Sequence, residues 1–178
     1  MTKAIALFDG QNLYHMARHA FGTVSAQVNP QALARAVCLA STWNLVESRY
    51  YTGIHSSQKN AKLNAAVQAH IYKMQSIGVQ TYVRTLRYQD GIAREKGIDM
   101  RIALDAINAV HSQSIDVVLL FSQDQDFVEL AEEVRRLNRQ LDRKVVIASA
   151  FPNSTKVRGI DKTDWKSFSK ADYLAALF

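Results

Sequence analysis

The feature that most constrains the fold is a regular alternation between short apolar runs and longer segments with helical spacing. Five runs have the length and the β-branched or aromatic content of buried strands. They lie at residues 4–8, 46–52, 79–85, 116–121 and 144–150. Strands that alternate with helices predict a parallel sheet with helices on both faces. We therefore expect an α/β, Rossmann-like three-layer sandwich around a five-stranded, mainly parallel sheet.

The expected helices are bounded by ordinary start and stop signals. Pro30 opens one of them at a position that favours proline, and Gly78 closes another, over residues 58–78, as a C-terminal cap. The others follow Asn12 or cover residues 98–111, 127–137 and 169–178. No repeat, low-complexity tract or linker interrupts the pattern, so residues 1–178 are expected to form a single domain.

Composition restricts the class of protein. Hydrophobic residues make up 48% of the chain and charged residues 21%, as in soluble globular proteins. The apolar runs are too short to cross a bilayer, and Asp9 comes too early for a signal peptide, so we expect a cytoplasmic protein with no membrane contact. The single cysteine, Cys38, excludes an internal disulfide. The net charge of +6 favours a polyanionic partner, above all nucleic acid.

Carboxylates follow two of the expected strands. Asp9 ends the first strand, and Asp124 and Asp126 come after the fourth, over residues 116–121. In open parallel sheets, ligands bind beyond the carboxyl ends of the strands, where the strand order reverses. If the first and fourth strands are neighbours, these acids converge.

The pair Asp124 and Asp126 carries more negative charge than a helix start requires. Two like charges this close repel each other unless a positive group lies between them. One aspartate before the next helix would be an ordinary cap, but here there are two, flanked by Ser122 and Gln123. Hard divalent cations such as Mg²⁺ prefer oxygen ligands of this kind.

Three other aspartates have two interpretations each. Asp9, in the segment LFDGQN, fits a turn, or it is a metal ligand with Asn12 orienting it. Asp99 falls in the middle of the apolar arc of the helix over residues 98–112, where a bare carboxylate is costly to bury. It is either an N-cap or points inward to a metal shared with Asp9. Asp105 lies on the polar arc, where it is solvated or supports the site.

A basic stretch runs from the third expected strand into the helix that carries Asp99. It is either a solvated loop or a rim that contacts phosphates, with tyrosines that stack on unpaired bases. Lys96, three residues before Asp99, would balance the acids or touch the scissile phosphate. The residues assigned to nucleic-acid binding are Arg84, Arg87, Tyr88, Arg94, Lys96 and Arg101.

Other catalytic patterns are weaker. His15 and His19 are four apart on an expected helix, as zinc ligands can be, but HMARH lacks the acid of the usual motif. No Gly-rich phosphate loop or dinucleotide fingerprint occurs. The segment DQDFV suits the Asp-x-Asp of a haloacid dehalogenase phosphatase. That fold, however, has its nucleophile after the first strand, and too little chain follows Asp126 for its further motifs.

Four segments resemble, in order, those of the NYN domain family, whose members are PIN-like nucleases. They are LFDGQNL, EKGIDMRIALDAI, VVLLFSQDQDFVEL and KADYLAAL. The chain is most similar to the bacterial LabA-like branch, and the resemblance covers nearly its whole length. It implies a PIN-like sheet in which the first and fourth expected strands are adjacent.

The resemblance also implies metal-dependent hydrolysis of RNA phosphodiester bonds, with Mg²⁺ or Mn²⁺ as cofactor. Its acidic, catalytic ligands correspond to Asp9, Asp99, Asp124 and Asp126. Asn12, Ser122, Lys96 and Asp105 are expected to support them. The expected partner is RNA in single-stranded form, and a homodimer is allowed because PIN-like proteins are often dimers.

One position departs from the family pattern. NYN domains commonly have Ser-Gly-Asp-Ser-Asp before the phenylalanine, and this chain has SQDQDF, with Gln123 in place of the glycine. The backbone there either needs no positive φ or tolerates strain. The departure leaves an alternative function open, that of a PIN-like RNA-binding or scaffold protein with weak or no turnover.

Overall fold

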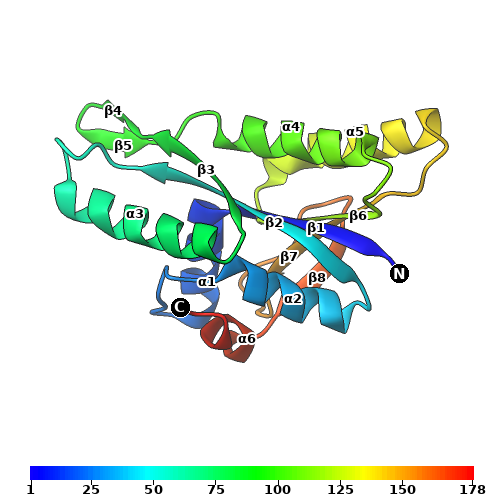
Figure 1. The fold of residues 1–178 in the computed structure, drawn as a ribbon, viewed down its shortest axis with the longest axis horizontal. Coiled ribbons are helices and arrows are strands. Elements are labelled where there is room, and N and C mark those ends of the chain that lie inside the picture. The colour runs from blue at the N-terminus through cyan, green and yellow to red at the C-terminus, as the bar shows by residue number, and fades with distance from the viewer.

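Six parallel strands form the central sheet of the computed structural model, which describes residues 1–178 (Figure 1). The strands are β1 (Lys3–Asp9), β2 (Asn44–Ile54), β3 (Gln80–Thr85), β6 (Val117–Phe121), β7 (Val146–Pro152) and β8 (Asp164–Phe168). Their order is β3-β2-β1-β6-β7-β8, and every neighbouring pair is parallel. The chain runs outward from β1 to β3 and then returns to β6 on the other side of β1. The expected α/β fold, with the first and fourth expected strands adjacent, is confirmed.

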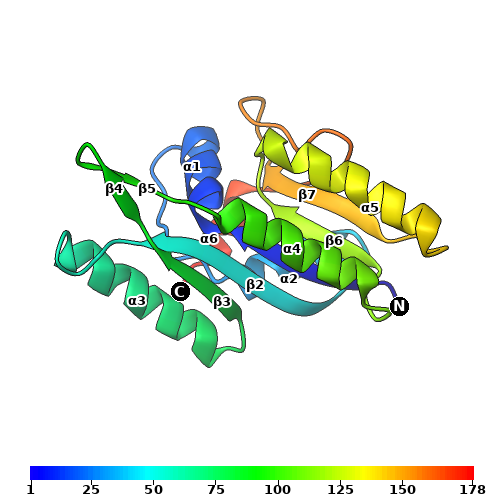
Figure 2. The same cartoon turned by 90° about the horizontal axis from the view of Figure 1, so that it is seen from above.

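Helices cover both faces of this sheet. On one face α4 (Ile98–His111) and α5 (Val128–Gln140) lie side by side (Figure 2). The opposite face carries α1 (Gly10–Phe21), α2 (Pro30–Ala40), α3 (Ala61–Ser76) and the short α6 (Lys170–Ala175). A 3₁₀ turn, η1 (Gln125–Phe127), precedes α5, and a hairpin of β4 (Arg87–Gln89) and β5 (Ile92–Arg94) projects past the end of β3. None of the helices has the length and apolar character needed to cross a membrane.

The two faces of β1 belong to two separate hydrophobic cores. Ala4, Ala6 and Phe8 join the core under α1 and α2, whereas Ile5 and Leu7 join the core under α4 and α5. All five side chains are at most 1% exposed. A strand that is buried on both faces reads as a continuous apolar run, which is why this segment is recognisable in the sequence.

Three strands were not expected from the sequence, β8 and the two strands of the β4–β5 hairpin, and the predicted count of five strands in the central sheet is wrong because β8 makes six. The segment of β8, DWKSF, lies at the sheet edge with Trp165 49% exposed, and it has no apolar run to mark it. The β4–β5 hairpin turns through Asp90 and Gly91, whose φ angles are 52° and 76°. Positive φ at both central residues is typical of a type I′ turn, for which the dipeptide Asp-Gly was the available signal.

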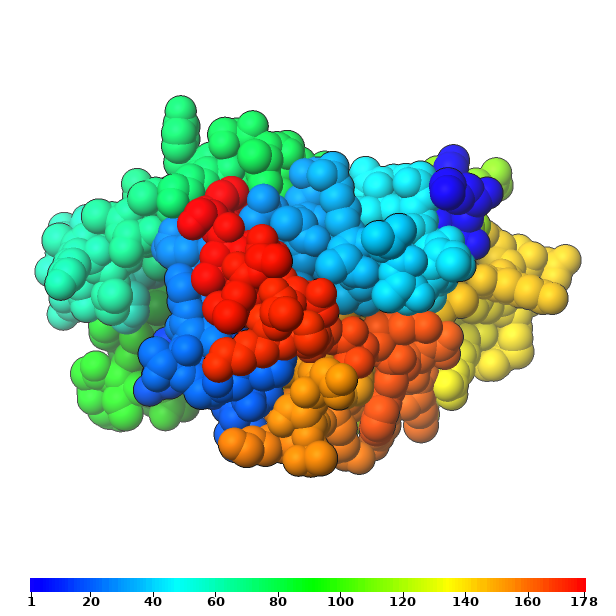
Figure 3. All heavy atoms as spheres, turned by 90° about the horizontal axis from the view of Figure 1, so that it is seen from below, coloured from blue at the N-terminus to red at the C-terminus, as the bar shows by residue number.

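The C-terminal segment packs against the loop before α2. Ser169 caps α6 in a capping box with Asp172, and the helix covers only Lys170–Ala175 of the expected 169–178. The Asn29 N–H donates to the Ala176 carbonyl (2.6 Å), and the Phe178 N–H donates to the Gln27 carbonyl (3.0 Å). Figure 3 shows this red segment lying against the blue residues of α1 and the lighter blue residues of α2.

Candidate metal centre and nucleic-acid cleft

An open cleft of about 520 Å³ lies at the carboxyl ends of β1 and β6. It is formed where the strand order reverses, the position at which parallel sheets bind ligands. Its lining is almost wholly polar and comes from α1, β5, the start of α4 and the loop after β6. The lining residues are Asp9, Gln11, Asn12, His15, Ala93, Arg94, Glu95, Asp99 and Asp124.

Asp9 is held at the floor of this cleft by the start of α1. It is the N-cap of that helix, and its Oδ1 accepts the Asn12 N–H at 3.0 Å. The Ser122 hydroxyl lies 3.5 Å from Asp9 Oδ2. Gly10 follows Asp9 because the Tyr50 ring lies where a side chain would be, within 2.4 Å of an added Cβ. Asp9 is therefore both a helix cap and a carboxylate that lines the cleft, and its role as a metal ligand stays a prediction.

Asn12 joins α1 to the loop after β6. Its Oδ1 accepts the Gln123 N–H at 3.0 Å, and Ser122 Oγ accepts the Asp124 N–H at 3.1 Å. Gln123 is not among the residues with positive φ, so this position needs no glycine. The turn that departs from the family pattern is thus unstrained, and its backbone is tied to the helix that carries Asp9.

Asp124 and Asp126 face different surroundings. Asp124 caps η1 by accepting the Asp126 N–H at 3.0 Å, and it lines the cleft. Asp126 is exposed and lines a neighbouring, more apolar hollow together with Asp99. Three of the four expected aspartates therefore share the cleft, and the fourth lies beside Asp99 at its border.

Asp99 lies in the first turn of α4, where it is exposed and makes no capping hydrogen bond. The N-cap of this helix is Gly97, with φ 78°, so the N-cap interpretation of Asp99 is wrong. Partial desolvation raises the pKa of Asp99, and the charges of Asp124 and Asp126 raise it further. The raised pKa of Asp99 therefore reflects partial desolvation and electrostatic repulsion from the carboxylates of Asp124 and Asp126.

Two carboxyls in the cleft have pKa values close to neutrality. Burial raises the pKa of Asp9 to about 6, the Asn12 N–H opposes the shift, and the charges of Asp99 and Asp124 add to it. Burial raises the pKa of Glu95 to about 7, with a further contribution from the charge of Asp9. Crowded carboxylates with no cation between them are expected to behave in this way.

Glu95 is the cleft acid that the sequence analysis missed. It follows β5, and its Oε2 is buried without a hydrogen-bond partner. Gly53 makes room for it, because Glu95 Oε2 lies 2.6 Å from where a Cβ on Gly53 would be. Its place depends on the unexpected hairpin, which turns the chain back toward β2. Gln11 and His15, one turn apart on α1, were likewise not assigned to the cleft.

Asp105 does not line the cleft, and its expected solvation is wrong. It is 5% exposed, and its Oδ2 accepts the Tyr51 hydroxyl at 2.8 Å and the Arg101 Nε at 3.1 Å. Arg49 Nη1 lies 3.7 Å from its other oxygen. The network joins α4 to β2, and it occupies Arg101, which was expected to bind nucleic acid.

The other expected nucleic-acid-binding residues are distributed along the end of β3 and the hairpin. Arg94 lines the cleft, and Lys96 and Arg87 are exposed. Arg84 is exposed and donates through Nε to the Tyr82 hydroxyl at 2.8 Å. Tyr88 is half-buried, and its hydroxyl lies 2.6 Å from His55 Nδ1. Arg94 is thus the member of this set that lines the cleft together with the acids.

The chemistry of the donor set fits a hard divalent cation. The cleft presents carboxylate and amide oxygens without thiols, and Glu95, whose Oε2 is buried without a hydrogen-bond partner, lines it as well. As the side chains stand, no group of three or more His, Cys, Asp or Glu side chains is close enough to hold a metal ion. Mg²⁺ suits such an arrangement because it usually keeps several water ligands and takes only one or two carboxylates.

Comparison with known proteins decides the family. The model of the NYN domain matches residues 3–164, which is most of the chain. The chain belongs to the NYN domain family. It is also similar to a crystal structure of a protein of unknown function from Vibrio parahaemolyticus, with 23% sequence identity and a TM-score of 0.63. That similarity covers 97% of this chain and 95% of the other.

NYN domains are a family of PIN-like nucleases, and the α/β sheet described above is consistent with a PIN-like fold. At 23% identity, the Vibrio protein supports the fold alone. Among curated proteins, no sequence matches this NYN domain significantly. Its activity therefore has to be argued from the cleft.

Proposed function

We propose that this NYN domain is a metal-dependent ribonuclease that hydrolyses phosphodiester bonds of single-stranded RNA. The observation that carries the proposal is the convergence of Asp9, Asp99 and Asp124, from three separate segments, on one cleft at the reversal of the strand order. Asp126 completes the acidic set from the cleft border. Mg²⁺ or Mn²⁺ is the proposed cofactor.

The electrostatics of the cleft support a bound cation. The pKa values of Asp9, Glu95 and Asp99 are all raised, with burial as the first cause and neighbouring carboxylates as a further one. A divalent cation reverses this effect, because its charge favours the ionised form of each carboxyl. Asp9 and Asp124 would hold it, and their orientation is fixed by Asn12 and Ser122.

The proposed chemistry assigns distinct tasks to the side chains. A bound divalent cation would supply Lewis-acid stabilisation of the charge that develops on the phosphate oxygens. Arg94 holds a phosphate of the strand in the cleft by charge-assisted hydrogen bonds. Glu95 lines the same cleft, and its carboxylate would add to the negative charge that attracts the cation.

The test is cleavage of a labelled single-stranded RNA by purified protein in Mn²⁺, compared with the same reaction in EDTA. Asp124→Asn keeps the size and capping ability of the side chain but removes its charge, and it should slow cleavage by about 100- to 1000-fold. Asp164→Asn is the matched control, because Asp164 is exposed on β8. Equal cleavage by Asp124→Asn and wild type would show that the assignment is wrong.

A second candidate is an RNA-binding or scaffold protein without turnover. It is favoured by one observation, the absence of three side chains grouped closely enough to hold a metal ion. The sequence suggested this candidate because Gln123 replaces a glycine of the family pattern. The backbone at Gln123 has no positive φ, so this argument no longer applies. This candidate predicts salt-sensitive RNA binding and no Mn²⁺-dependent products in the same assay.

A further inference from the structure

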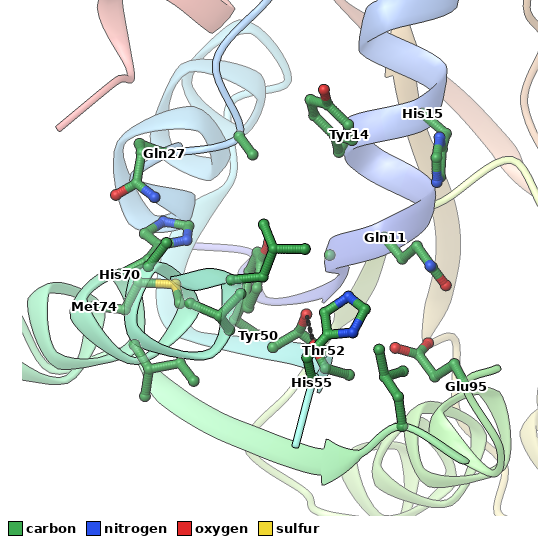
Figure 4. Close-up of a pocket in the computed structure, with 18 residues that line it drawn as sticks. Gln11, Tyr14, His15, Gln27, Tyr50, Thr52, His55, His70, Met74 and Glu95 are labelled. Carbon is green, nitrogen blue, oxygen red and sulfur yellow. Dashed lines mark hydrogen bonds between the residues drawn. The ribbon is translucent and has the colours of Figure 1, made fainter. Parts of the chain in front are cut away.

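A second cavity, of about 380 Å³, opens beside the acidic cleft between α1, α3 and the end of β2 (Figure 4). Gln11, His15 and Glu95 line both the cavity and the cleft, so the two are adjacent. In Figure 4, Gln11 and His15 project from α1 on one side, and His70 and Met74 lie on α3 on the other. A strand with a phosphate in the cleft therefore brings its neighbouring groups to the mouth of this cavity.

The walls of the cavity are apolar and aromatic. Ala66, Val67 and His70 recur on α3 at the spacing of one helix face, and this face is turned toward the cavity. The Tyr50 ring forms another wall, and it meets the His70 ring edge-on at 5.7 Å between centroids. Half of the 18 lining residues are hydrophobic. Such a site is shaped for a flat, largely apolar group.

The charges around the cavity argue against a phosphate as its occupant. No lysine or arginine lines it, and Glu95 adds a carboxyl at the side shared with the cleft. Its other polar groups include the amides of Gln11 and Gln27 and the hydroxyl of Tyr14. Amides and hydroxyls can form hydrogen bonds with the edge of a base, while the aromatic and aliphatic walls contact its faces.

We propose that this cavity receives one unstacked nucleobase of the RNA strand whose phosphodiester lies in the acidic cleft. The inference rests on the proposed function, which it extends by assigning a base-binding subsite next to the site of cleavage. Unpaired bases that leave the stack and enter aromatic pockets are the usual means by which proteins recognise single-stranded RNA. The cavity thus selects for a base, whereas Arg94 and the acids contact only the backbone.

The test fills the cavity with a larger side chain on α3 and leaves the acidic residues of the cleft unchanged. Ala66→Trp places a large side chain in the cavity, and Ala65→Trp, on the outer face of the same helix, is the matched control. The probes are fluorescein-labelled hexaadenylate, hexauridylate and a fully abasic RNA hexamer, with binding measured by anisotropy in EDTA. Wild type should bind at least one base-containing hexamer about tenfold or more tightly than the abasic one.

Ala66→Trp should lose about tenfold in affinity for that hexamer and none for the abasic one, and Ala65→Trp should match wild type. Equal losses for both kinds of hexamer, or no loss, would overturn the proposal. Because binding is measured without metal, it is independent of cleavage. Base-dependent binding without Mn²⁺-dependent products would refute only the nuclease, and cleavage without base dependence would refute only the subsite.

A second measurement on the wild-type chain covers the case in which Ala66→Trp does not fold, as judged by circular dichroism. A hexamer of 4-thiouridine is photocrosslinked to the protein in EDTA, and the modified peptides are mapped by mass spectrometry. The proposal expects crosslinks in peptides that contain Tyr50, His55 or Ala66. Crosslinks confined to the hairpin or to other surfaces would overturn it.

Discussion

At Asp9, the ionised carboxylate that the proposed activity requires is the form that destabilises the fold. Its carboxyl is 5% exposed and faces Asp99 and Asp124, whose charges make its ionised form less favourable. In the unfolded chain, the same carboxyl has an ordinary pKa of 3.8. The folded protein therefore binds the Asp9 proton more tightly than the unfolded chain does, and ionisation of Asp9 destabilises the fold.

The first prediction concerns Asp9→Asn. Asn caps a helix as well as Asp does, so the exchange removes the charge and keeps the cap. Ionisation of Asp9 should lower the free energy of unfolding of wild type by roughly 2–3 kcal/mol as the pH rises from about 4 through about 6. Glu95 and Asp99 add their own decrease in both proteins, so the variant should show a decrease that is smaller by the Asp9 contribution and should gain about that much relative to wild type at pH 7.5. Urea denaturation in EDTA at pH 4 and pH 7.5 measures both values.

A bound cation should reverse the order of stability of wild type and Asp9→Asn. Millimolar Mn²⁺ should raise the melting temperature of wild type, because a ligand that binds only the folded state stabilises it. Asp9→Asn lacks the central carboxylate and should show a smaller shift. If Asp9→Asn is less stable than wild type at pH 7.5 in EDTA, then the ionised Asp9 carboxylate does not destabilise the fold.

The second prediction separates Asp105 from the acids of the cleft. Tyr51→Phe removes the hydroxyl that donates to Asp105 at 2.8 Å and leaves a buried carboxylate with fewer partners. The free energy of unfolding should decrease by about 1–2 kcal/mol. The rate of RNA cleavage, measured well below the melting temperature, should stay at the wild-type level. A large loss of rate with unchanged stability would instead assign Asp105 to the active site.

The sequence predicted the carboxylates that line the cleft where they follow a regular rule. Asp9 ends β1 and Asp124 comes shortly after β6, and both strands are visible as apolar runs because they are buried on both faces. Glu95 and Asp105 were missed or misplaced because their surroundings are tertiary. Glu95 depends on a hairpin that folds back over Gly53, and Asp105 on a tyrosine from another strand.

At the scale of elements, the end of α4 is stabilised by a single arginine. Arg143, in the loop before β7, donates to the carbonyls of Val110, Ser112 and Ile115 at 2.5–2.7 Å. These carbonyls lie in the last turn of α4 and the loop that follows, where they have few partners within the helix. A positive charge also interacts favourably with a helix C-terminus.

The third prediction follows from these contacts. Arg143→Ala should lower the free energy of unfolding by about 2–3 kcal/mol, because three carbonyl acceptors lose a charged donor. Arg139→Ala is the control, since Arg139 is exposed at the end of α5 and should cost less than about 0.5 kcal/mol. Urea denaturation of both variants gives the comparison. Equal effects of the two exchanges would show that the contacts of Arg143 carry no net stability.

The elements themselves differ in how visible they are in the sequence. The interior strands and long helices carry apolar periodicity, and their existence was predicted correctly. The edge strand β8 and the β4–β5 hairpin are exposed and charged, and they form because of what they pair with. Apolar periodicity arises because side chains on one face of an element are buried. Elements that bury little surface therefore show little apolar periodicity in the sequence.

At the scale of the whole molecule, acidic and basic residues are separated around the cleft, whereas elsewhere they pair, as Glu133 does with Arg136. The net charge is +6, yet carboxylates concentrate at the cleft, so the remaining surface is more basic than the total indicates. Exposed Arg84, Arg87 and Lys96 lie on the β3–hairpin side of the cleft. This arrangement suits a polyanion that is attracted by the surroundings and brought to the acids by Arg94.

The fourth prediction tests this separation. Arg94→Ala should weaken binding of single-stranded RNA and reduce the slope of log affinity against log salt by about 0.7, the value for one phosphate contact. Arg139→Ala, which removes the same charge on the far side of α5, should leave the slope unchanged. Anisotropy titrations between 50 and 300 mM salt provide the slopes. Identical slopes for both variants would remove Arg94 from the RNA-binding surface.

The central place of β1 has a consequence for the newly made chain. Asp9 meets Ser122 across 113 residues, and β1 lacks its β6 neighbour until both have left the ribosome. At about 5–20 residues per second, this delay is about 6–23 s. For the proposed ribonuclease activity, the order of the strands means that the acids of the cleft cannot come together on a nascent chain before β6 has left the ribosome.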